Sequence, residues 1–306
     1  MSKVIVYIEK KALGLVLPLQ RAVVGFIERR DLDDYLKSDR RPWRRGYALY
    51  RNNYLRDVIY DFSALERFRK LKPLPAGYGF RLDARLVEIP WVLGHLEKES
   101  GRLLDAGSSL NVDFVLKSPA LVNKKITIVT LAPESECHWK LGVSYVFGDL
   151  RNLEFQSDWF DTIVCISTIE HIGMDNTMYA GSIEKAQGRN PKDFALAMKE
   201  FKRVLKPGGV LYITFPFGEY EDHGWFQQFD SLLTDRLIQE FGPSNFSETV
   251  FRYDPDGWKL SDRASCARCQ FFDIHKSKYF DPDSTLDYPP DYPAGERAVV
   301  CLEMVK

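Results

Sequence analysis

The sequence predicts an α/β fold with a Rossmann-like, doubly wound sheet that is mostly parallel, an antiparallel last strand and an N-terminal helical extension. Three observations predict it. Apolar runs rich in β-branched residues recur between residues 103 and 215, with helix-length segments between them, as is typical of parallel sheets buried on both faces. A Gly/Ser turn, residues 107–109, follows the first run, and Ala298–Val305 is a confident last strand.

The N-terminal extension, residues 1–82, is expected to be mostly helical. Residues 4–8 are apolar and fit either a strand or the start of a helix. Residues 10–30 mix apolar and basic side chains in a pattern that fits an amphipathic helix, which either lies on a membrane or docks on the protein's own core. Because Pro18 and Gly25 weaken a long regular helix, we favour docking on the core.

A basic turn and a second helix complete the extension. Residues 1–51 hold twelve Lys and Arg against six Asp and Glu, and Arg40–Arg45 is the most basic part. We expect this excess to be a solvated surface, and the alternative is a peripheral membrane contact through residues 10–45. Apolar residues three apart predict a helix over Asp57–Leu71, which a linker at Lys72–Gly77 follows.

The main domain is predicted to span residues 83–306. Helices are expected over Arg85–Glu99 and over Phe194–Leu205, where apolar residues spaced three and four apart form one face. Strands are predicted at Leu103–Asp105, Ile126–Leu131, Tyr145–Phe147, Thr162–Ser167, Val210–Phe215, Phe246–Tyr253 and Ala298–Val305. Two polar segments, 174–191 and 217–295, are predicted to be inserted loops that contact the substrate or cover it.

Composition restricts the class of protein. Hydrophobic residues make up 45% and charged residues 28% of the 306 residues, which is ordinary for a globular protein. A net charge of −1 provides no general attraction to nucleic acid. Five cysteines without a disulfide-like spacing, and no secretory pattern at the N-terminus, predict a cytoplasmic protein. No uncharged apolar run reaches the ~18 residues that a membrane-spanning helix needs.

A strand, an acidic residue and a turn of small residues together indicate a ligand site. Asp105 ends the first strand, and Ala106, Gly107, Ser108 and Ser109 follow it. Small residues there let the backbone approach a ligand closely. In open α/β sheets, ligands bind beyond the carboxyl ends of the strands. Dinucleotide-binding folds use similar turns, so this turn alone does not identify the ligand.

Four segments, taken in order, resemble class I S-adenosylmethionine-dependent methyltransferases with a core of the methyltransferase type 11 kind. They are residues 101–109, Phe147–Leu150, Phe160–Ile172 and Phe201–Ile213. Their order and spacing match across more than a third of the chain, whereas residues 1–95 and 217–295 resemble no family. The resemblance implies methyl transfer as the activity and S-adenosyl-L-methionine as the cofactor.

The resemblance also implies roles for individual residues. Asp105 would lie near the ammonium group of the methionine moiety, beside the turn described above. Asp149 would accept a hydrogen bond from the adenine amino group, and Leu150 would offer a backbone donor to the ring. Ser167 and Thr168, at the end of the fourth strand, would line the methyl-transfer cleft. The alternative for both aspartates is a capping role at a helix or a turn.

The ribose position departs from the family's pattern. The family usually ends the second strand with an acid that holds both ribose hydroxyls, and here Thr130 stands in that place, followed by Leu131. A single hydroxyl replaces only part of a bidentate carboxylate contact. Glu134 or Glu136 is a candidate to compensate. The alternative is that the domain keeps the fold but has lost catalysis.

Two histidines are candidate bases for the reaction. The sulfonium methyl is already activated, so alignment of the acceptor provides most of the rate, but a neutral hydroxyl acceptor also needs a base for its proton. His171 directly follows the fourth strand, with Glu170 before it, and is the first candidate. His223, in a polar aromatic loop, is the second. The alternative for Glu170 and His171 is a structural role, since this pair recurs in family members with varied substrates.

A metal site is not expected. Cys266 and Cys269 form a single C-x-x-C pattern, and His275 follows them. These three residues fall short of the four ligands of a structural zinc site. His95 and His138 lack comparable surroundings and are expected to be surface or packing residues.

The sequence therefore predicts a methyltransferase that acts on a small-molecule hydroxyl, most of all on a carbohydrate or glycan precursor, which a lipid could carry. The polar segment 174–191 and aromatic residues such as Trp225 and Trp258 suit a polyhydroxylated substrate. The alternatives are a non-catalytic binding module and an N-methyltransferase of a small metabolite. Nucleic acid is not an expected partner, since no Asn-Pro-Pro-Tyr-type motif follows the fourth strand.

Overall fold

The structure is a computed structural model that describes residues 25–97, 99–180 and 189–306. The chain divides into two compact units, residues 1–54 and residues 55–306. The expectations for residues 4–8, and for residues 10–24 of the amphipathic pattern, lie outside the described residues. The domain boundary proposed between residues 82 and 83 stays a prediction, as does the membrane contact.

The first unit is helical where it is described. Residues 25–37 form a helix, and a turn leads into α2 (Tyr47–Tyr60). The buried rings of Tyr35 and Tyr47 meet edge to face with centroids 6.2 Å apart, and the Tyr35 hydroxyl donates a hydrogen bond to the Arg40 carbonyl at 2.9 Å. Arg45 of the basic turn pairs with Asp31 at 2.8 Å. Part of the basic excess is therefore neutralised within this unit.

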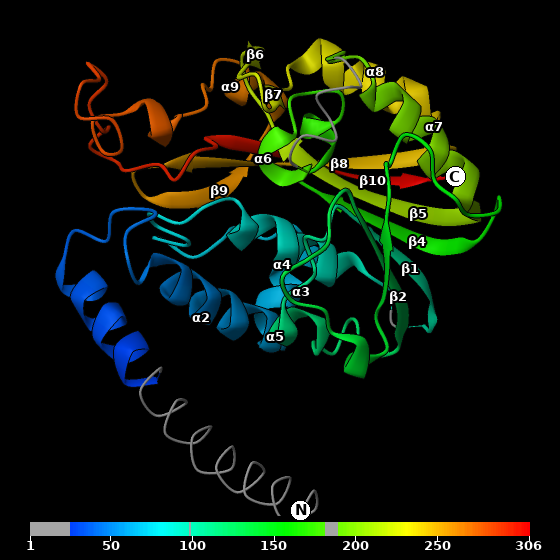
Figure 1. Cartoon of the computed structure of the whole chain (residues 1–306), viewed down its shortest axis with the longest axis horizontal. Coiled ribbons are helices and arrows are strands. Elements are labelled where there is room, and N and C mark those ends of the chain that lie inside the picture. The colour runs from blue at the N-terminus through cyan, green and yellow to red at the C-terminus, as the bar shows by residue number, and fades with distance from the viewer. Residues whose placement is uncertain (1–24, 98, 181–188) are drawn as a thin grey trace, which may run out of the picture. The chain divides into compact units, whose positions relative to one another are not determined.

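An eight-stranded sheet forms the centre of the second unit (Figure 1). Its strand order is β3-β2-β1-β4-β5-β10-β8-β9. The strands are β1 (Gly101–Ala106), β2 (Lys124–Thr130), β3 (Ser144–Phe147), β4 (Phe160–Ile166), β5 (Leu205–Pro216), β8 (Asn245–Asp254), β9 (Gly257–Ser261) and β10 (Ala298–Val305). Strands β1 to β5 pair in parallel, and β10 pairs antiparallel with β5. The predicted fold class is thus confirmed.

The antiparallel strand β10 does not lie at the edge of the sheet. It inserts between β5 and β8, and β9 pairs antiparallel with β8 to form the edge. Residues Val299–Leu302 of β10 are completely buried. The sequence predicted β8 and β10 but no strand at β9, because residues 257–261 carry no apolar alternation that stands out from the surrounding loop.

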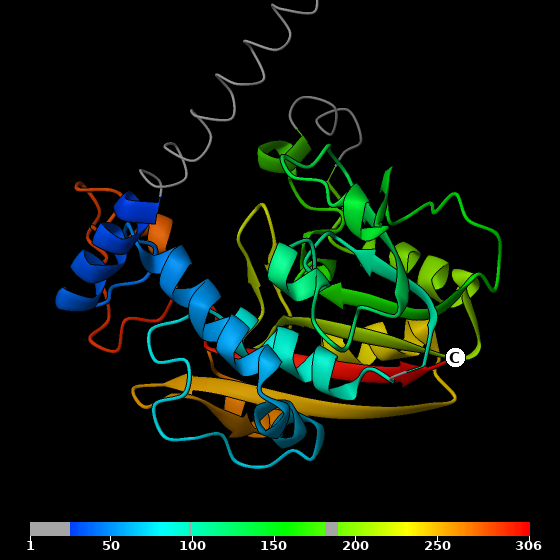
Figure 2. The same ribbon diagram turned by 90° about the horizontal axis from the view of Figure 1, so that it is seen from below.

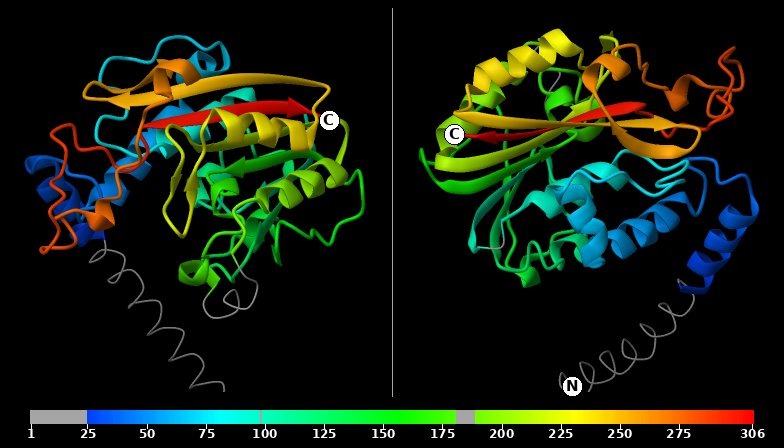
Figure 3. Two further views of the ribbon diagram at one scale, coloured as in Figure 1. Left: turned by 90° about the horizontal axis from the view of Figure 1, so that it is seen from above. Right: turned by 180° about the vertical axis from the view of Figure 1, so that it is seen from behind.

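Helices cover both faces of the sheet (Figures 1 and 3). On one face lie α3 (Phe62–Arg69), α4 (Arg85–His95) and α5 (Asp113–Leu116), with α4 crossing in front of the sheet in Figure 2. On the other face lie α7 (Phe194–Val204) and α8 (Ser231–Phe241). The apolar faces of α7 and α8 join the strands in one core cluster, and on the other face Leu86, Val87, Trp91 and Val92 of α4 are completely buried. This two-sided burial explains why the central strands are near-continuous apolar runs.

Three predicted helices differ from the observed ones at their ends. The helix predicted over Asp57–Leu71 is broken at Asp61, whose carboxylate accepts from the Ser63 backbone N–H at 2.8 Å and caps α3. The helix predicted to reach Glu99 ends at His95. The helix predicted to reach Leu205 ends one residue earlier, because Leu205 already pairs with Phe160 in the sheet.

The segment 217–295, predicted as inserted loops, also contains regular structure. It holds α8, β8 and β9, a short hairpin of β6 (Glu221–Asp222) and β7 (Gln227–Gln228), and the single turn α9 (Arg263–Cys266). Leu237 and Phe241 of α8 are completely buried in the core. Much of this segment therefore builds the fold, and its contact with the substrate stays a prediction. Within the described residues, no helix is long and apolar enough to cross a membrane.

Candidate active site

The site begins at the sharp turn after β1. Gly107 has φ 107° and Ser108 has φ 67°, so both lie in the region that favours glycine. A Cβ atom on Gly107 would lie 2.1 Å from the Thr168 hydroxyl oxygen, which excludes any other residue there. The Gly107 backbone N–H donates to the Val129 carbonyl at 2.9 Å. The turn is thus pressed between β2 and the residues that follow β4.

Asp105 is buried beneath this turn and accepts a hydrogen bond from the backbone that follows it. It is completely buried, and its Oδ2 accepts a hydrogen bond from the Leu110 backbone N–H at 2.9 Å. Its Oδ1 has no hydrogen-bond partner among the described residues. Burial raises the pKa of Asp105 to about 7, although the backbone N–H groups of Leu110 and Ser109 act in the opposite direction. Asp105 and Ala106 lie under the turn and do not line the cavity described next.

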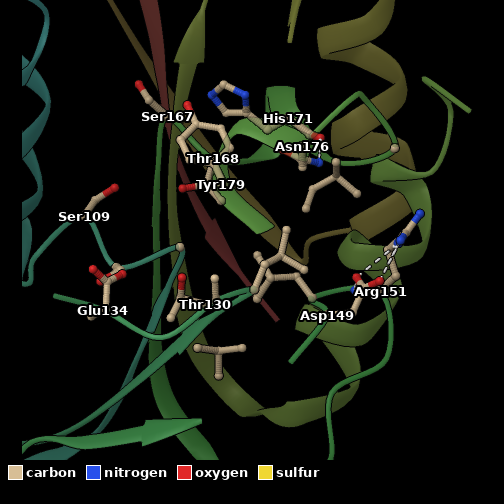
Figure 4. A pocket seen from close by; sticks show the side chains of 18 of the residues that line it. Ser109, Thr130, Glu134, Asp149, Arg151, Ser167, Thr168, His171, Asn176 and Tyr179 are labelled. Atoms are coloured by element: carbon tan, nitrogen blue, oxygen red, sulfur yellow. Dashed lines mark hydrogen bonds and ion pairs between the residues drawn. The ribbon is translucent and has the colours of Figure 1, made fainter. Parts of the chain in front are cut away.

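A cavity of about 420 Å³ opens beyond the carboxyl ends of the parallel strands (Figure 4). Polar side chains from four strand ends, from α4 and from the segment after β4 surround it. The lining residues are Arg85, Gly107, Ser108, Ser109, Val129, Thr130, Leu131, Ala132, Pro133, Glu134, Asp149, Leu150, Arg151, Ser167, Thr168, His171, Ile172, Gly173, Asn176 and Tyr179. Nearly all the residues that the resemblance assigned to the cofactor are therefore brought together.

At the β3 end of the cavity, Asp149 is already paired with an arginine. Arg151 Nε lies 2.9 Å from Asp149 Oδ2 and 3.1 Å from Oδ1, and Arg151 Nη2 lies 2.6 Å from Oδ2. Arg151 Nη1 also contacts Asp193 at 2.8 Å, just before α7. Hydrogen bonding to Asp149 raises the pKa of Arg151 and keeps it charged. A ligand at Asp149 therefore meets an ion pair rather than a free carboxylate.

At the end of β2, Thr130 and Glu134 both face the cavity, as Figure 4 shows. Glu134 is half-buried, and no hydrogen bond from a described residue occupies its carboxylate. Glu136 does not line the cavity, and its carbonyl accepts from the Asn111 side chain at 3.1 Å. Of the two acids considered as replacements for the one missing at Thr130, Glu134 is the one the fold brings to the cavity.

His171 lines the cavity from the short 3₁₀ turn after β4, residues 169–171. Its Nδ1 lies 2.9 Å from the Trp225 carbonyl, so Nδ1 carries the proton and donates it. This leaves Nε2 as an acceptor. Burial lowers the pKa of His171 to about 4, so the ring is neutral at physiological pH. Tyr179 lies edge-on to the ring, with centroids 5.5 Å apart.

The other two predicted catalytic residues lie elsewhere. Glu170 is buried, does not line the cavity and stands 3.9 Å from His171 Nε2. Burial raises its pKa well above the usual range. His223 contacts Glu221 at 2.9 Å and stacks flat on Phe226 at 4.4 Å, outside the cavity lining. His223 is thus packed into the β6–β7 hairpin, and its role as a base stays a prediction.

Four polar residues that line the cavity, Arg85, Arg151, Asn176 and Tyr179, were not among the predicted site residues. Arg151 and Arg85 come from a loop and from the start of α4, and no local motif marks either of them. Asn176 and Tyr179 belong to the polar segment 174–191, of which residues 181–188 lie outside the described ones.

In the described parts of the chain, no group of three His, Cys, Asp or Glu could hold a metal ion. His275 contacts the Phe280 ring instead.

Comparison with known proteins found a matching family and matching solved structures. Residues 105–213 match a family described as a methyltransferase domain. A Thermotoga maritima structure, described as an SAM-dependent methyltransferase and possible histamine N-methyltransferase, is 16% identical with a TM-score of 0.44, and the match covers 83% of this chain and 99% of that one. No protein of curated function matches.

A second structure of similar fold is the 1,6-didemethyltoxoflavin-N1-methyltransferase of Burkholderia thailandensis with bound S-adenosylhomocysteine. It is 15% identical with a TM-score of 0.41, and the match covers 85% of this chain and 88% of that one. Both likenesses are too distant to indicate the substrate of this chain.

Proposed function

We propose that this chain, which carries a class I S-adenosyl-L-methionine-dependent methyltransferase domain, transfers the methyl group to a hydroxyl of a small molecule. A carbohydrate or glycan precursor is the substrate class we favour. The bound cofactor supplies a sulfonium methyl group that needs only an aligned acceptor. The residues of this chain then have to bind the cofactor, orient the acceptor and remove one proton.

Residues in and beneath the cavity match the parts of the cofactor. Asp105 is buried beneath the turn, outside the cavity lining, and its Oδ1, which has no hydrogen-bond partner among the described residues, would attract the methionine ammonium group electrostatically. Glu134 and Thr130 provide acceptors for ribose hydroxyls where the usual acid is missing. Asp149 still has lone pairs beside Arg151 for the adenine amino group, since a carboxylate has about four acceptor sites. Gly107 lets the backbone come close to the ligand.

The geometry of His171 carries the proposal for a hydroxyl acceptor. The bond from Nδ1 to the Trp225 carbonyl fixes the tautomer and leaves Nε2 of this cavity-lining ring able to accept a proton. A ring with a pKa of about 4 is a weak base. A weak base is sufficient, because a hydroxyl becomes strongly acidic as its oxygen bonds to the methyl group. Ser167, Asn176 and Tyr179 add neutral polar groups that suit a polyhydroxylated acceptor.

The experiment is methyl transfer from labelled S-adenosylmethionine to a panel of sugars, sugar nucleotides, phenols and amines, read by mass spectrometry. We expect His171→Ala to lower turnover about 100-fold, with cofactor affinity by calorimetry within about twofold of the wild type. His275→Ala, which changes an exposed histidine outside the cavity, is the matched control and should leave both unchanged.

Each result has a distinct meaning. Unchanged turnover in His171→Ala would remove that residue from the base role. Methylation of amines alone would favour the N-methyltransferase alternative over transfer to oxygen. Failure to bind the cofactor at millimolar concentration would favour a non-catalytic module with this fold.

A further inference from the structure

Arg85 brings a positive charge into the cavity from outside the strand ends. It is the first residue of α4, and 30% of its side chain is exposed where it lines the cavity. Its Nη1 lies 3.1 Å from Glu88 Oε2, one helical turn further along. The contact holds one nitrogen of the guanidinium group, and no described residue accepts a hydrogen bond from Nε or Nη2.

Glu88 is fixed from three directions. Its side chain is 1% exposed, and its Oε1 accepts hydrogen bonds from the Ser167 hydroxyl at 2.5 Å and from the Thr214 hydroxyl at 2.7 Å. Ser167 itself has φ 39°, an unusual backbone conformation for a serine. These bonds join α4 to the ends of β4 and β5. Glu88 is therefore a rigid support that sets the direction of Arg85.

The two arginines of the cavity differ in their free donors. Arg151 uses three nitrogen atoms on Asp149 and Asp193. Arg85 Nε and Nη2 donate to no described residue, and together they form the planar edge that binds a carboxylate through two parallel hydrogen bonds. Arg85 is thus the arginine of the described cavity that can still accept an anionic ligand.

The surrounding charges favour a single carboxylate over a more highly charged anion. Burial lowers the pKa of Arg85, but the carboxylates of Glu88, Asp83, Glu170 and Glu296 raise it above its usual value, so the guanidinium stays charged. Burial also raises the pKa of Glu296 to about 7 and that of Glu170 well above its usual range. Because the carboxylates of Glu88 and Asp83 lie close to the arginine, a phosphate with two charges would be repelled more strongly than a carboxylate.

We propose that Arg85, directed by Glu88, is the carboxylate-binding residue of this cavity. The carboxylate belongs either to the methionine moiety of the cofactor or to an acidic acceptor such as a uronic acid. This inference deepens the proposed function and rests on it. Glu88 acts through Arg85 and is a positioning residue.

Calorimetry with two nucleosides tests whether the cofactor supplies the carboxylate that Arg85 binds. S-adenosylhomocysteine carries the amino-acid carboxylate, and 5′-methylthioadenosine lacks it. If the cofactor supplies the carboxylate, Arg85→Met weakens S-adenosylhomocysteine binding about tenfold or more and leaves 5′-methylthioadenosine within about twofold. Arg85→Lys, which keeps the charge but not the planar edge, should fall in between.

Sugar binding, measured without cofactor, tests whether the acceptor supplies the carboxylate that Arg85 binds. If the acceptor supplies the carboxylate, wild-type protein binds D-glucuronate more tightly than D-glucose, and Arg85→Met removes that preference. Arg252→Met, a substitution of an arginine outside the cavity, is the control in both arms. Arg85→Met leaves the buried carboxylate of Glu88 without its charged partner. Both binding experiments are therefore repeated with the double variant Arg85→Met/Glu88→Gln, in which that carboxylate is replaced by a neutral amide.

Two results would overturn the inference. One is an equal loss of affinity for both nucleosides, which would mean that Arg85 only supports the fold. The other is unchanged binding of S-adenosylhomocysteine together with an unchanged sugar preference. If wild-type protein binds neither nucleoside, the proposed function fails, and the glucuronate arm still decides the role of Arg85 because it needs no cofactor.

Discussion

Two aspartates, one buried beneath the turn after β1 and one lining the cavity at the end of β3, show how differently one residue type can be prepared for a ligand. Asp105 is completely buried, one of its oxygens has no partner among the described residues, and burial raises its pKa to about 7. Asp149 is half-buried, and Arg151 contacts both of its oxygens. The first carboxylate is held in an unfavourable environment, and the second is already neutralised.

The difference suggests how binding energy is distributed along the cavity. A cationic group that approaches Asp105 stabilises a charge that the free protein leaves uncompensated. A neutral amino group that approaches Asp149 adds one hydrogen bond to a complete ion pair. Favourable interactions with a ligand should therefore be larger at the Asp105 end, at the expense of stability in the free protein.

The largest expected effect concerns the stability of the free protein. Asp105→Asn should raise the free energy of unfolding by about 1 to 3 kcal/mol at pH 8, since it removes a carboxylate that folding makes harder to ionise. A raised folded-state pKa means that stability is lost as pH rises from about 4, the unfolded value, to about 7. The gain over the wild type should therefore grow across that range and stay constant above it.

Urea unfolding of both proteins between pH 5 and pH 8, without cofactor, measures this difference. Asp149→Asn is the matched control, since its carboxylate is paired, and it should lower stability instead. A constant difference between Asp105→Asn and the wild type across the whole range would contradict the strained state of Asp105.

The next effect concerns cofactor affinity at the same residue. Asp105→Asn should weaken S-adenosylhomocysteine binding about tenfold to 100-fold, the range for a lost hydrogen bond or charge contact of ~1.5–3 kcal/mol. In the wild type, affinity should rise as pH increases through about 7, because the ionised carboxylate binds the ammonium group better. Calorimetry at pH 6 and pH 8 measures both, and an equal pH dependence in the variant would exclude Asp105 as the cause.

Asp149→Ala should have a smaller effect, of about tenfold on the affinity for S-adenosylhomocysteine. Its loss removes the adenine contact, but Arg151 keeps its ion pair with Asp193. Titration of Asp149→Ala and of Asp105→Asn with S-adenosylhomocysteine at pH 8 compares the loss of affinity at the two aspartates directly. A larger loss in Asp149→Ala than in Asp105→Asn would reverse the comparison.

The smallest effect is expected between the two ends, at the ribose. Glu134→Gln should weaken S-adenosylhomocysteine binding about fivefold, since a neutral amide replaces a charge-assisted hydrogen bond. Glu136→Gln, outside the cavity, should change nothing. Titration of both variants with the same ligand measures this, and equal affinities would leave Thr130 as the main ribose contact at this strand end.

Local sequence determined much of the fold and the centre of the site. The apolar runs predicted the strands β1 to β5, and Gly107 predicted the turn, because only glycine fits beside Thr168 in that conformation. Motif order also brought Ser109, Thr130, Asp149 and Ser167 to one cavity. These features depend on residues close together in the chain, or on the rule that parallel strands present their carboxyl ends at one edge.

Only the tertiary structure decided the state of the groups in that cavity. Arg151 pairs with Asp149, Glu88 directs Arg85, and the Trp225 carbonyl fixes the tautomer of His171 across 54 positions of sequence. Residue type names a charge or a proton acceptor, but its pKa and its free lone pairs depend on burial and on partners from distant elements. For this reason the sequence located the cavity, and the folded chain determined which of its groups are free to act.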